Sequence, residues 1–280
     1  MYKCLACGKQ FIGGERLSEQ SLWEDYVYGK QTLVQLSKKS GKSERTIRRK
    51  LSIYEITISP KSIRKIIVLM DTTYWGRNFG VMLFKDALTG ENLYKHYVKY
   101  ETVNLYRQGI FHLQKIGYEI EAIVCDGRRG LLGGFGNTPT QMCIFHQIAI
   151  VTRYLTRKPR TSASKELRNI AMLLKKTDKE SFEGLLNEWH QQWNTYINEQ
   201  VIDPISGKKK FLHQRLRSAY RSLKRNLPFL FCWYDNMQLK IPTTTNAIDG
   251  QFADLKNKLR VHNGLSLKLK MKIIDEFLKA

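Results

Sequence analysis

The spacing of apolar residues changes along the chain. From about residue 17 to 54, and again from about 147 to 234, apolar residues recur at intervals of three and four, as in amphipathic helices. Between these segments, from about 62 to 147, short apolar runs bounded by turn residues predict strands. The chain ends in another helical pattern that reaches Ala280. This order predicts an α/β layer flanked and interrupted by helical segments.

The first helical segment has the spacing of a helix-turn-helix. Gly41 permits the turn, and Ser43 is placed to cap the helix that follows. The apolar seam of the two helices consists of Leu33, Leu36, Ile47 and Leu51.

The second of these helices is strongly basic. Such groups suit phosphates and guanine edges when the helix lies in a major groove, and this favours DNA binding over an ordinary helical hairpin with a solvated basic face. Pro60 then marks a linker. The residues expected to contact DNA here are Arg45, Arg48, Arg49 and Lys50.

The N-terminus contains half of a possible zinc ribbon. Cys4 and Cys7 have the spacing of one knuckle, and Phe11 is placed to seal a small core. Structural zinc needs four ligands, and no second pair follows nearby. A metal-free turn remains the alternative, and we do not expect Zn²⁺ at this position.

The central segment predicts a mixed sheet. Its elements follow in the order strand, strand, strand, helix, strand, short helix, strand, with a hairpin turned near 88–92 and a helix over 106–116. The runs 65–71, 118–126 and 139–147 read as buried strands. We therefore expect an α/β fold that is not a doubly wound dinucleotide-binding fold.

The second helical segment predicts an all-α insertion. Trp189 and Trp193 are four residues apart, so we interpret them as core residues and not as a platform for stacked bases. Pro204 and Gly207 interrupt the helical pattern.

Composition narrows the class of partner. The 280 residues include 47 Lys and Arg against 25 Asp and Glu, giving a formal charge of +22 and a pI near 9.8. Such charge predicts a polyanionic partner. No apolar run reaches the roughly 18 residues of a membrane span, and Met1 begins no signal-peptide pattern, so nucleic acid is favoured over lipid. Five cysteines, an odd number, fit a reducing cytoplasm.

Two carboxylates are the first candidates for chemistry. Asp71 and Asp126 each stand at the predicted end of a hydrophobic strand, where a carboxylate loses hydration unless a cation or hydrogen bonds replace it. Adjacent strand ends bring both within reach of the same metal. Two divalent ions about 4 Å apart activate a water or a 3′-hydroxyl for phosphodiester displacement. Oxygen ligands point to Mg²⁺ or Mn²⁺.

Asp249 is our candidate for a third carboxylate. If Asn246 caps the last but one helix, Asp249 also fits the third position of a capping box, so helix capping remains a competing explanation. Asp249 lies at the edge of the apolar stripe, and Lys256 follows on a surface suited to a DNA backbone. The rival carboxylates are Asp86, Asp254 and Glu276.

Four stretches together resemble a known family. The segments "MDTTYWG", "VCDGRRG", "MCIFH" and "TTTNAIDGQFADLK", in this order and with a helical block before the last, resemble the DDE transposases of bacterial insertion sequences, particularly the Mutator-like group. The resemblance covers residues 66–278 and implies an RNase H-like core with an all-α insertion. It implies acidic positions at Asp71, Asp126 and Asp249. The third is usually Glu in the family, so this chain departs from the pattern there.

The resemblance also assigns the family's C-x2-H pair to Cys143 and His146. We expect His146 to be an accessory residue near the scissile phosphate, and Arg128 to join the DNA-contacting residues. The implied domains are a knuckle over 1–14, a helix-turn-helix over 15–58, a core over 62–149 with 240–280, and an insertion over 150–239.

The expected function is therefore that of a DNA transposase. It binds terminal inverted repeats and target DNA as a dimer or higher assembly, and directs metal-dependent cleavage and strand transfer near the bacterial nucleoid. The alternative is a catalytically decayed or domesticated DNA-binding relative. A basic helical scaffold for RNA is a third reading, which leaves the three carboxylates as coincidence.

Overall fold

The computed structural model describes residues 2–11, 17–202, 204, 207–262 and 264–280. Within these residues the chain forms two compact units, one made of Met1–Ser59 with Phe252–Lys279 and the other of Pro60–Gln251 with Ala280. The two units are described separately. The expected boundary between residues 14 and 15 lies outside the described residues.

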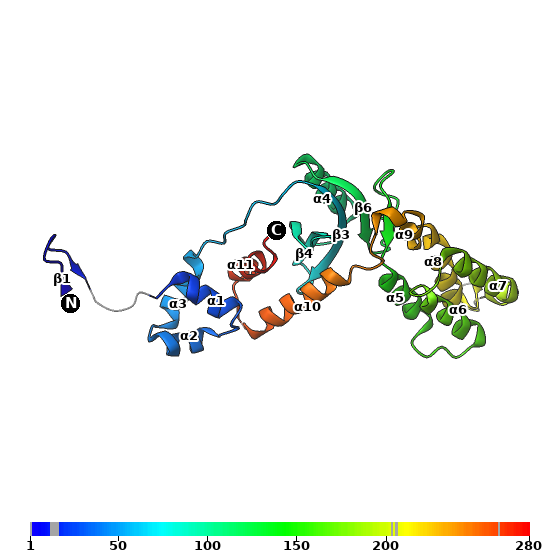
Figure 1. Ribbon diagram of the computed structural model, residues 1–280. Coiled ribbons are helices and arrows are strands. Elements are labelled where there is room, and N and C mark those ends of the chain that lie inside the picture. Colours follow the sequence, from blue (N-terminus) through cyan, green and yellow to red (C-terminus); the bar gives the residue numbers. More distant parts are fainter. Residues whose placement is uncertain (1, 12–16, 203, 205–206, 263) are drawn as a thin grey trace. The chain divides into compact units, whose positions relative to one another are not determined.

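The larger unit is built on a five-stranded mixed sheet (Figure 1). Its spatial order is β5-β4-β3-β6-β7, in which β3, β4 and β5 are antiparallel neighbours and β3, β6 and β7 are parallel. The expected mixed α/β layer is confirmed, and the order is compatible with an RNase H-like core. The strands are β3 (Lys65–Tyr74), β4 (Gly80–Asp86), β5 (Asn92–Val98), β6 (Glu119–Cys125) and β7 (Thr140–Met142).

Strand β3 lies in the middle of the sheet, and its residues from Ile66 to Met70 are buried. Helix α4 (Val103–Lys115) covers one face of the sheet. Gly109 makes this packing possible, since a Cβ atom there would lie 2.0 Å from the Phe84 ring on β4. The helix begins after Thr102, whose hydroxyl accepts from the Leu105 amide. It therefore starts three residues before the predicted helix.

The connection from the sheet to the helical insertion differs from the expectation. Strand β7 ends at Met142, and helix α5 (Ile144–Leu155) begins after Cys143, so His146 lies in the first turn of a helix and not at a strand end. Pairing ends there because β6 itself stops at Cys125, whose carbonyl accepts from the Cys143 amide at 2.8 Å. The described residues between β6 and β7 form turns, not the expected short helix.

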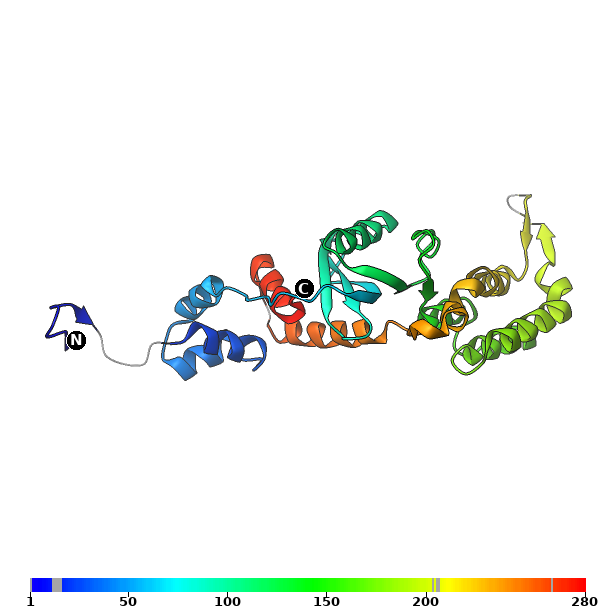
Figure 2. The same cartoon turned by 45° about the horizontal axis from the view of Figure 1, so that its top comes forward.

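The insertion is mainly helical but not all-α. A hairpin of β8 (Gln200–Ile202) and β9 (Lys209–Phe211) follows α7 (Figure 2). Trp189 is buried and its indole N–H donates to the Ala163 carbonyl, so the interpretation of this residue as core is confirmed. The helical elements after α5 are α6 (Ser162–Leu173), α7 (Lys179–Ile197), α8 (Gln214–Leu230), α9 (Cys232–Asp235) and the 3₁₀ turn Met237–Leu239.

The smaller unit contains three short helices joined by tight turns. They are α1 (Glu19–Val27), α2 (Leu33–Ser40) and α3 (Glu44–Ile53). Gly41 ends α2 with a φ of 65°, and the Ser43 hydroxyl accepts from the Thr46 amide at the start of α3, both as predicted. The buried side chains of this bundle include Trp23, Tyr26, Leu36, Ile47 and Leu51.

A two-stranded hairpin precedes these helices. It is made of β1 (Tyr2–Lys3) and β2 (Gln10–Phe11), and its turn carries Cys4 and Cys7.

The C-terminal helices join the smaller unit instead of the sheet, which differs from the domain limits expected for 240–280. Helix α10 (Asn246–Val261) belongs to the smaller unit from Phe252 onward, together with α11 (Leu267–Leu278). The Tyr28 hydroxyl donates to the Glu276 carboxylate at 2.8 Å, and the Lys272 ammonium donates to the Leu51 carbonyl at 2.8 Å. These contacts with α1 and α3 explain why the residues from Phe252 onward belong to the smaller unit.

The rival carboxylates have other roles. Asp86 is 1% exposed and accepts hydrogen bonds from Arg64, Leu88 and Thr89. Glu276 is buried and bound by Tyr28 and Lys279, whereas Asp254 is exposed on α10.

We predict that Asp86→Ala lowers the free energy of unfolding by about 3 kcal/mol, because it leaves the Arg64 guanidinium without its buried partner. Urea denaturation measures the loss. The matched control is Glu119→Ala, which removes an exposed carboxylate paired with Lys65 and costs less than about 1 kcal/mol. Equal losses in the two variants would contradict the structural role of Asp86.

Candidate metal centre

Parallel pairing places Asp71 and Asp126 side by side. The observed register ends with Leu69 on β3 opposite Val124 on β6; Asp71 lies two residues further along β3, and Asp126 lies directly after the last residue of β6. Side chains two residues apart share a face, and parallel neighbours lie about 4.8 Å apart. Asp71 does not end its strand, because β3 continues to Tyr74 beside β4. It lies where β6 stops, and this leaves one flank of β3 open.

The start of α10 brings in Asp249. The Thr245 carbonyl accepts from the amides of Ile248 and Asp249, so Thr245 occupies the cap position and Asn246 is already helical. A capping box needs its acid three residues after the cap, and that residue is Ile248. The Asp249 carboxylate instead accepts from the Thr245 hydroxyl at 3.4 Å. The capping box expected for Asp249 is therefore not formed.

Two contacts hold this turn against the sheet. Ile248 is fully buried, and the Lys85 ammonium on β4 donates to the Gln251 side-chain oxygen at 3.1 Å. The first turn of α10 is thus fixed on β4, next to the strand that carries Asp71.

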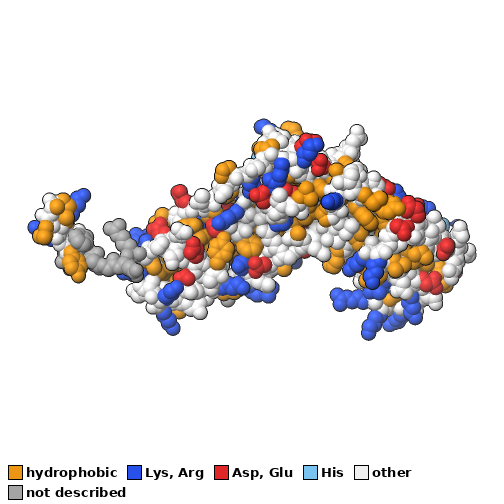
Figure 3. Space-filling view, in the orientation of Figure 1, with side chains coloured by type: hydrophobic (Ala, Val, Ile, Leu, Met, Phe, Trp, Pro, Cys, Tyr) orange, Lys and Arg blue, Asp and Glu red, His pale blue; other side chains and the backbone are white. Residues whose placement is uncertain are grey.

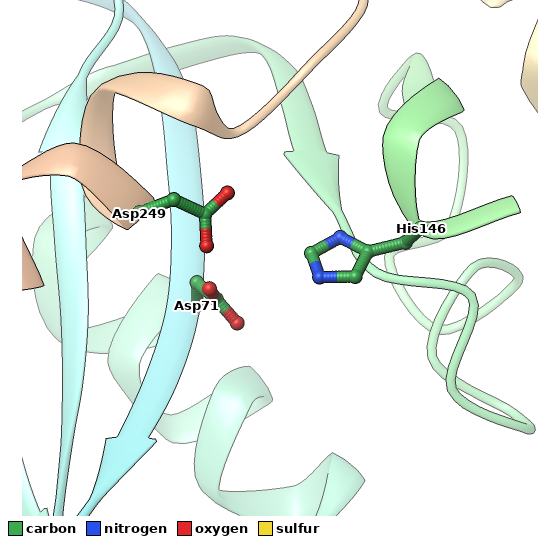
Figure 4. A group of neighbouring side chains, drawn as sticks. All are labelled: Asp71, His146 and Asp249. Atoms are coloured by element: carbon green, nitrogen blue, oxygen red, sulfur yellow. The ribbon is translucent and has the colours of Figure 1, made fainter. Parts of the chain in front are cut away.

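The result is a cluster of Asp71, His146 and Asp249, which we call the metal-ligand cluster. One potential ligand atom from each lies within 4.8 Å of the others, and it is the one such group of three among the described residues. In Figure 4 the imidazole of His146 points from α5 toward the two carboxylates. Its Nδ1 atom is buried and has no hydrogen-bond partner in the described part of the chain. A cation would satisfy it.

The electrostatics of the metal-free cluster favour protonated side chains, so a cation that binds there must displace a proton from His146 or be held by the carboxylates alone. Burial raises the pKa of Asp71 to about 7, and the negative charges of Asp249 and Asp126 add to this. The interaction with the Cys143 thiol raises the pKa of His146 to about 9, and the charges of Asp71 and Asp249 contribute. Carboxylates together with an imidazole are a ligand set for divalent transition metals such as Mn²⁺. Mg²⁺ favours oxygen ligands and would be held by the two carboxylates.

Cys143 connects the two helix starts. Its sulfur accepts from the backbone amide and from the hydroxyl of Thr245, each at 3.4 Å. Burial raises the pKa of the Cys143 thiol, but hydrogen bonds from His146 and Thr245 outweigh it and lower the pKa below its usual value. Cys143 therefore links the turn that carries His146 to the turn that carries Asp249.

Asp126 stands beside the cluster and not within it. Its carboxylate accepts from the Arg128 amide at 3.1 Å, and its charge contributes to the raised pKa of Asp71. The structure thus brings Asp249 and His146 to Asp71, and keeps Asp126 on the neighbouring strand outside the 4.8 Å group.

A polar network that sequence reasoning missed borders the carboxylates. The Tyr106 hydroxyl donates to Glu101 at 2.7 Å and lies 2.9 Å from the Thr72 hydroxyl, and Thr72 follows Asp71 directly. Arg128 pairs with Glu101 at 2.9 Å. Burial raises the pKa of Glu101. The only sign of this network in the sequence was the position of Glu101, a carboxylate directly before the helix cap Thr102.

The residues expected to contact DNA differ in availability. Lys50 pairs with Glu19 at 3.1 Å and Arg128 with Glu101, so both are already engaged. Lys256 is partly buried on α10, in the smaller unit. Those that are exposed on α3 are Arg45, Arg48 and Arg49.

The comparisons with known proteins add little. No protein-family model matches the chain, and no curated protein matches it. A chain from the cryo-electron microscopy structure of simian T-cell lymphotropic virus intasome in complex with PP2A regulatory subunit B56 gamma is similar to it. The identity is 10%, the coverage is 72% of this chain and 68% of that chain, and the TM-score is 0.23. A similarity at this level supports no conclusion about the fold or the function of this chain.

Among the described residues, no helix is long and apolar enough to cross a membrane.

We predict that Asp71→Asn stabilises the metal-free protein in a pH-dependent manner. The pKa of Asp71 is about 7 in the folded protein against an ordinary value of 3.8, so the folded state binds more protons and wild-type stability falls as pH rises through this window. The variant is free of this loss. Urea denaturation in EDTA should give similar stabilities near pH 4 and a variant more stable by roughly 1–3 kcal/mol at pH 8. A difference independent of pH would contradict the assignment.

Proposed function

We propose that this protein is a DNA transposase of the DDE type, here with three aspartates, in which the metal-ligand cluster holds Mg²⁺ or Mn²⁺ for phosphodiester cleavage and strand transfer. The observation that carries the proposal is the convergence of Asp71, His146 and Asp249 within 4.8 Å, from a strand and two separate helices. A buried carboxylate is costly to ionise without a cation; burial is the main cause of the raised pKa of Asp71, and the charges of Asp249 and Asp126 add to it.

In this proposal each residue has a defined task. Asp71 and Asp249 supply carboxylate oxygens, and Asp126 supplies a further carboxylate from the neighbouring strand. His146 lies in the same cluster and either joins the ligands or contacts DNA beside the scissile phosphate. These residues would hold the cation, which when bound would supply Lewis-acid chemistry: a lower pKa for the attacking water or 3′-hydroxyl and stabilisation of the leaving oxygen.

The proposed DNA contacts lie in both units. We assign recognition of the terminal inverted repeats to α2 and α3 as a helix-turn-helix, with the exposed Arg45, Arg48 and Arg49 reading the major groove. Figure 3 shows further Lys and Arg side chains gathered where α5 leads into α6, and this surface suits a phosphate backbone. Joining two DNA ends requires at least a dimer on DNA.

The competing proposal is a decayed or domesticated relative that only binds DNA. The aspartate at position 249 favours it, because the resembling family usually has the longer Glu there. Against it, α10 already brings the Asp249 carboxylate into the cluster. The shorter side chain is compensated by the position of its helix.

The test is cleavage of a DNA fragment that carries the sequences flanking the gene, with Mg²⁺ or Mn²⁺. Wild type is expected to cut, and Asp71→Asn and Asp249→Asn to lose about 100-fold or more in rate while retaining DNA binding. The control is Asp254→Asn, which removes an exposed carboxylate of the same helix and leaves cutting unchanged.

The outcomes separate the two proposals. If wild type binds the fragment without cutting and Asp249→Glu restores cutting, the decayed relative is correct. If no variant cuts but all bind with the same affinity, the protein is a DNA-binding protein and the transposase proposal fails.

A further inference from the structure

A pocket of about 640 Å³ lies in the larger unit between the helical insertion and the start of α10. Its volume is within the range of about 300–1,000 Å³ that is typical of small-ligand sites. Its lining includes Ile144, Lys175, Lys176, Trp233, Thr243 and Asn246.

The pocket shares two helix starts with the metal-ligand cluster. Ile144 lines it and lies two residues before His146 on α5, and Asn246 lines it and lies three residues before Asp249 on α10. Three helical residues correspond to a rise of about 4.5 Å. The Ile144 amide donates to the Thr243 carbonyl at 2.9 Å, which joins the two starts. The pocket and the metal-ligand cluster are therefore lined by neighbouring residues of the same two helix starts.

The polar groups of the pocket favour an anion. Lys175 and Lys176 are exposed, and no ion pair or hydrogen bond involves their ammonium groups in the described residues. The indole N–H of Trp233 is buried and has no partner in the same described part. Asp178 is the one carboxylate lining the pocket, and it already accepts from the amide and hydroxyl of Ser181 at 2.8 Å.

We propose that this pocket binds the sugar-phosphate backbone of the DNA strand next to the bond that is cut. The proposal rests on the proposed function. The two lysines neutralise phosphates, and the Trp233 indole N–H donates to a phosphate oxygen. The pocket, which is larger than one phosphate needs, accommodates a nucleotide. The DNA strand is then held in the pocket, next to the phosphodiester bond that lies at the metal-ligand cluster.

The experiment measures the affinity of a fluorescent single-stranded oligonucleotide, by anisotropy in EDTA and over a range of salt, for the full-length chain. Lys175→Ala/Lys176→Ala is expected to weaken binding about tenfold at low salt and to reduce the salt slope by about 1.4, because each phosphate contact in a single strand contributes about 0.7. The charge-matched control Lys208→Ala/Lys209→Ala removes two exposed lysines at the β8–β9 hairpin.

A second pair of variants changes no charge. Trp233→Phe replaces the indole by a phenyl ring, which removes the N–H together with the five-membered ring, and is expected to weaken binding about threefold to tenfold. Its control, Trp193→Phe, removes an indole N–H bonded to Glu166 elsewhere in the insertion. Unchanged melting temperatures show that the variants fold.

The outcomes distinguish this inference from the proposed function. If the lysine and Trp233 variants bind like their controls, or if millimolar inorganic phosphate displaces the oligonucleotide from wild type as readily as unlabelled DNA does, the pocket is not a DNA site, whether or not wild type cleaves DNA. If these variants lose affinity and their controls do not, the inference holds even when no cleavage is observed.

Discussion

The burial of ionisable side chains beside the open flank of β3 is the constraint that the larger unit has to accommodate. Asp71 and Asp249 share a cluster with ligand atoms within 4.8 Å, and Asp126 stands on the adjacent strand. The fold tolerates this because the groups sit on elements held elsewhere, namely a strand buried on both faces and a helix turn fixed to β4. Burial raises the pKa of Asp71 to about 7, and the charges of Asp249 and Asp126 contribute to the shift.

The positions of the ligand residues are set by backbone geometry more than by side-chain length. Parallel register aligns the two strand aspartates, and the Cys143 sulfur joins the starts of α5 and α10 through Thr245. The first turn of α10 is held next to the sheet by these contacts, which is how the Asp249 carboxylate comes to lie in the cluster. The polar network of Glu101, Tyr106 and Thr72 then supports the opposite side of Asp71.

Local signals predicted the local structure well. Ser43 and Gly41 predicted the limits of α2 and α3, and the hairpin of β4 and β5 followed from its turn residues. The run from Met142 to Phe145 did not reveal that a strand gives way to a helix, because a short apolar run fits either structure.

Long-range contacts account for the remaining differences. Thr245 and Asn246 are both good helix caps, and only the contact of Thr245 with Cys143, about 100 residues earlier, selects between them. The same limit applies to the C-terminal helices, whose partner is decided by contacts such as the hydrogen bond from the exposed Tyr28 to the buried Glu276 carboxylate.

Helix α10 belongs to both units. Its first turn carries Asp249 in the larger unit, and its residues from Phe252 onward pack within the smaller one. Asn246–Val261 is one unbroken helix, so a single hydrogen-bonded element carries both the third residue of the cluster and the residues that pack in the smaller unit.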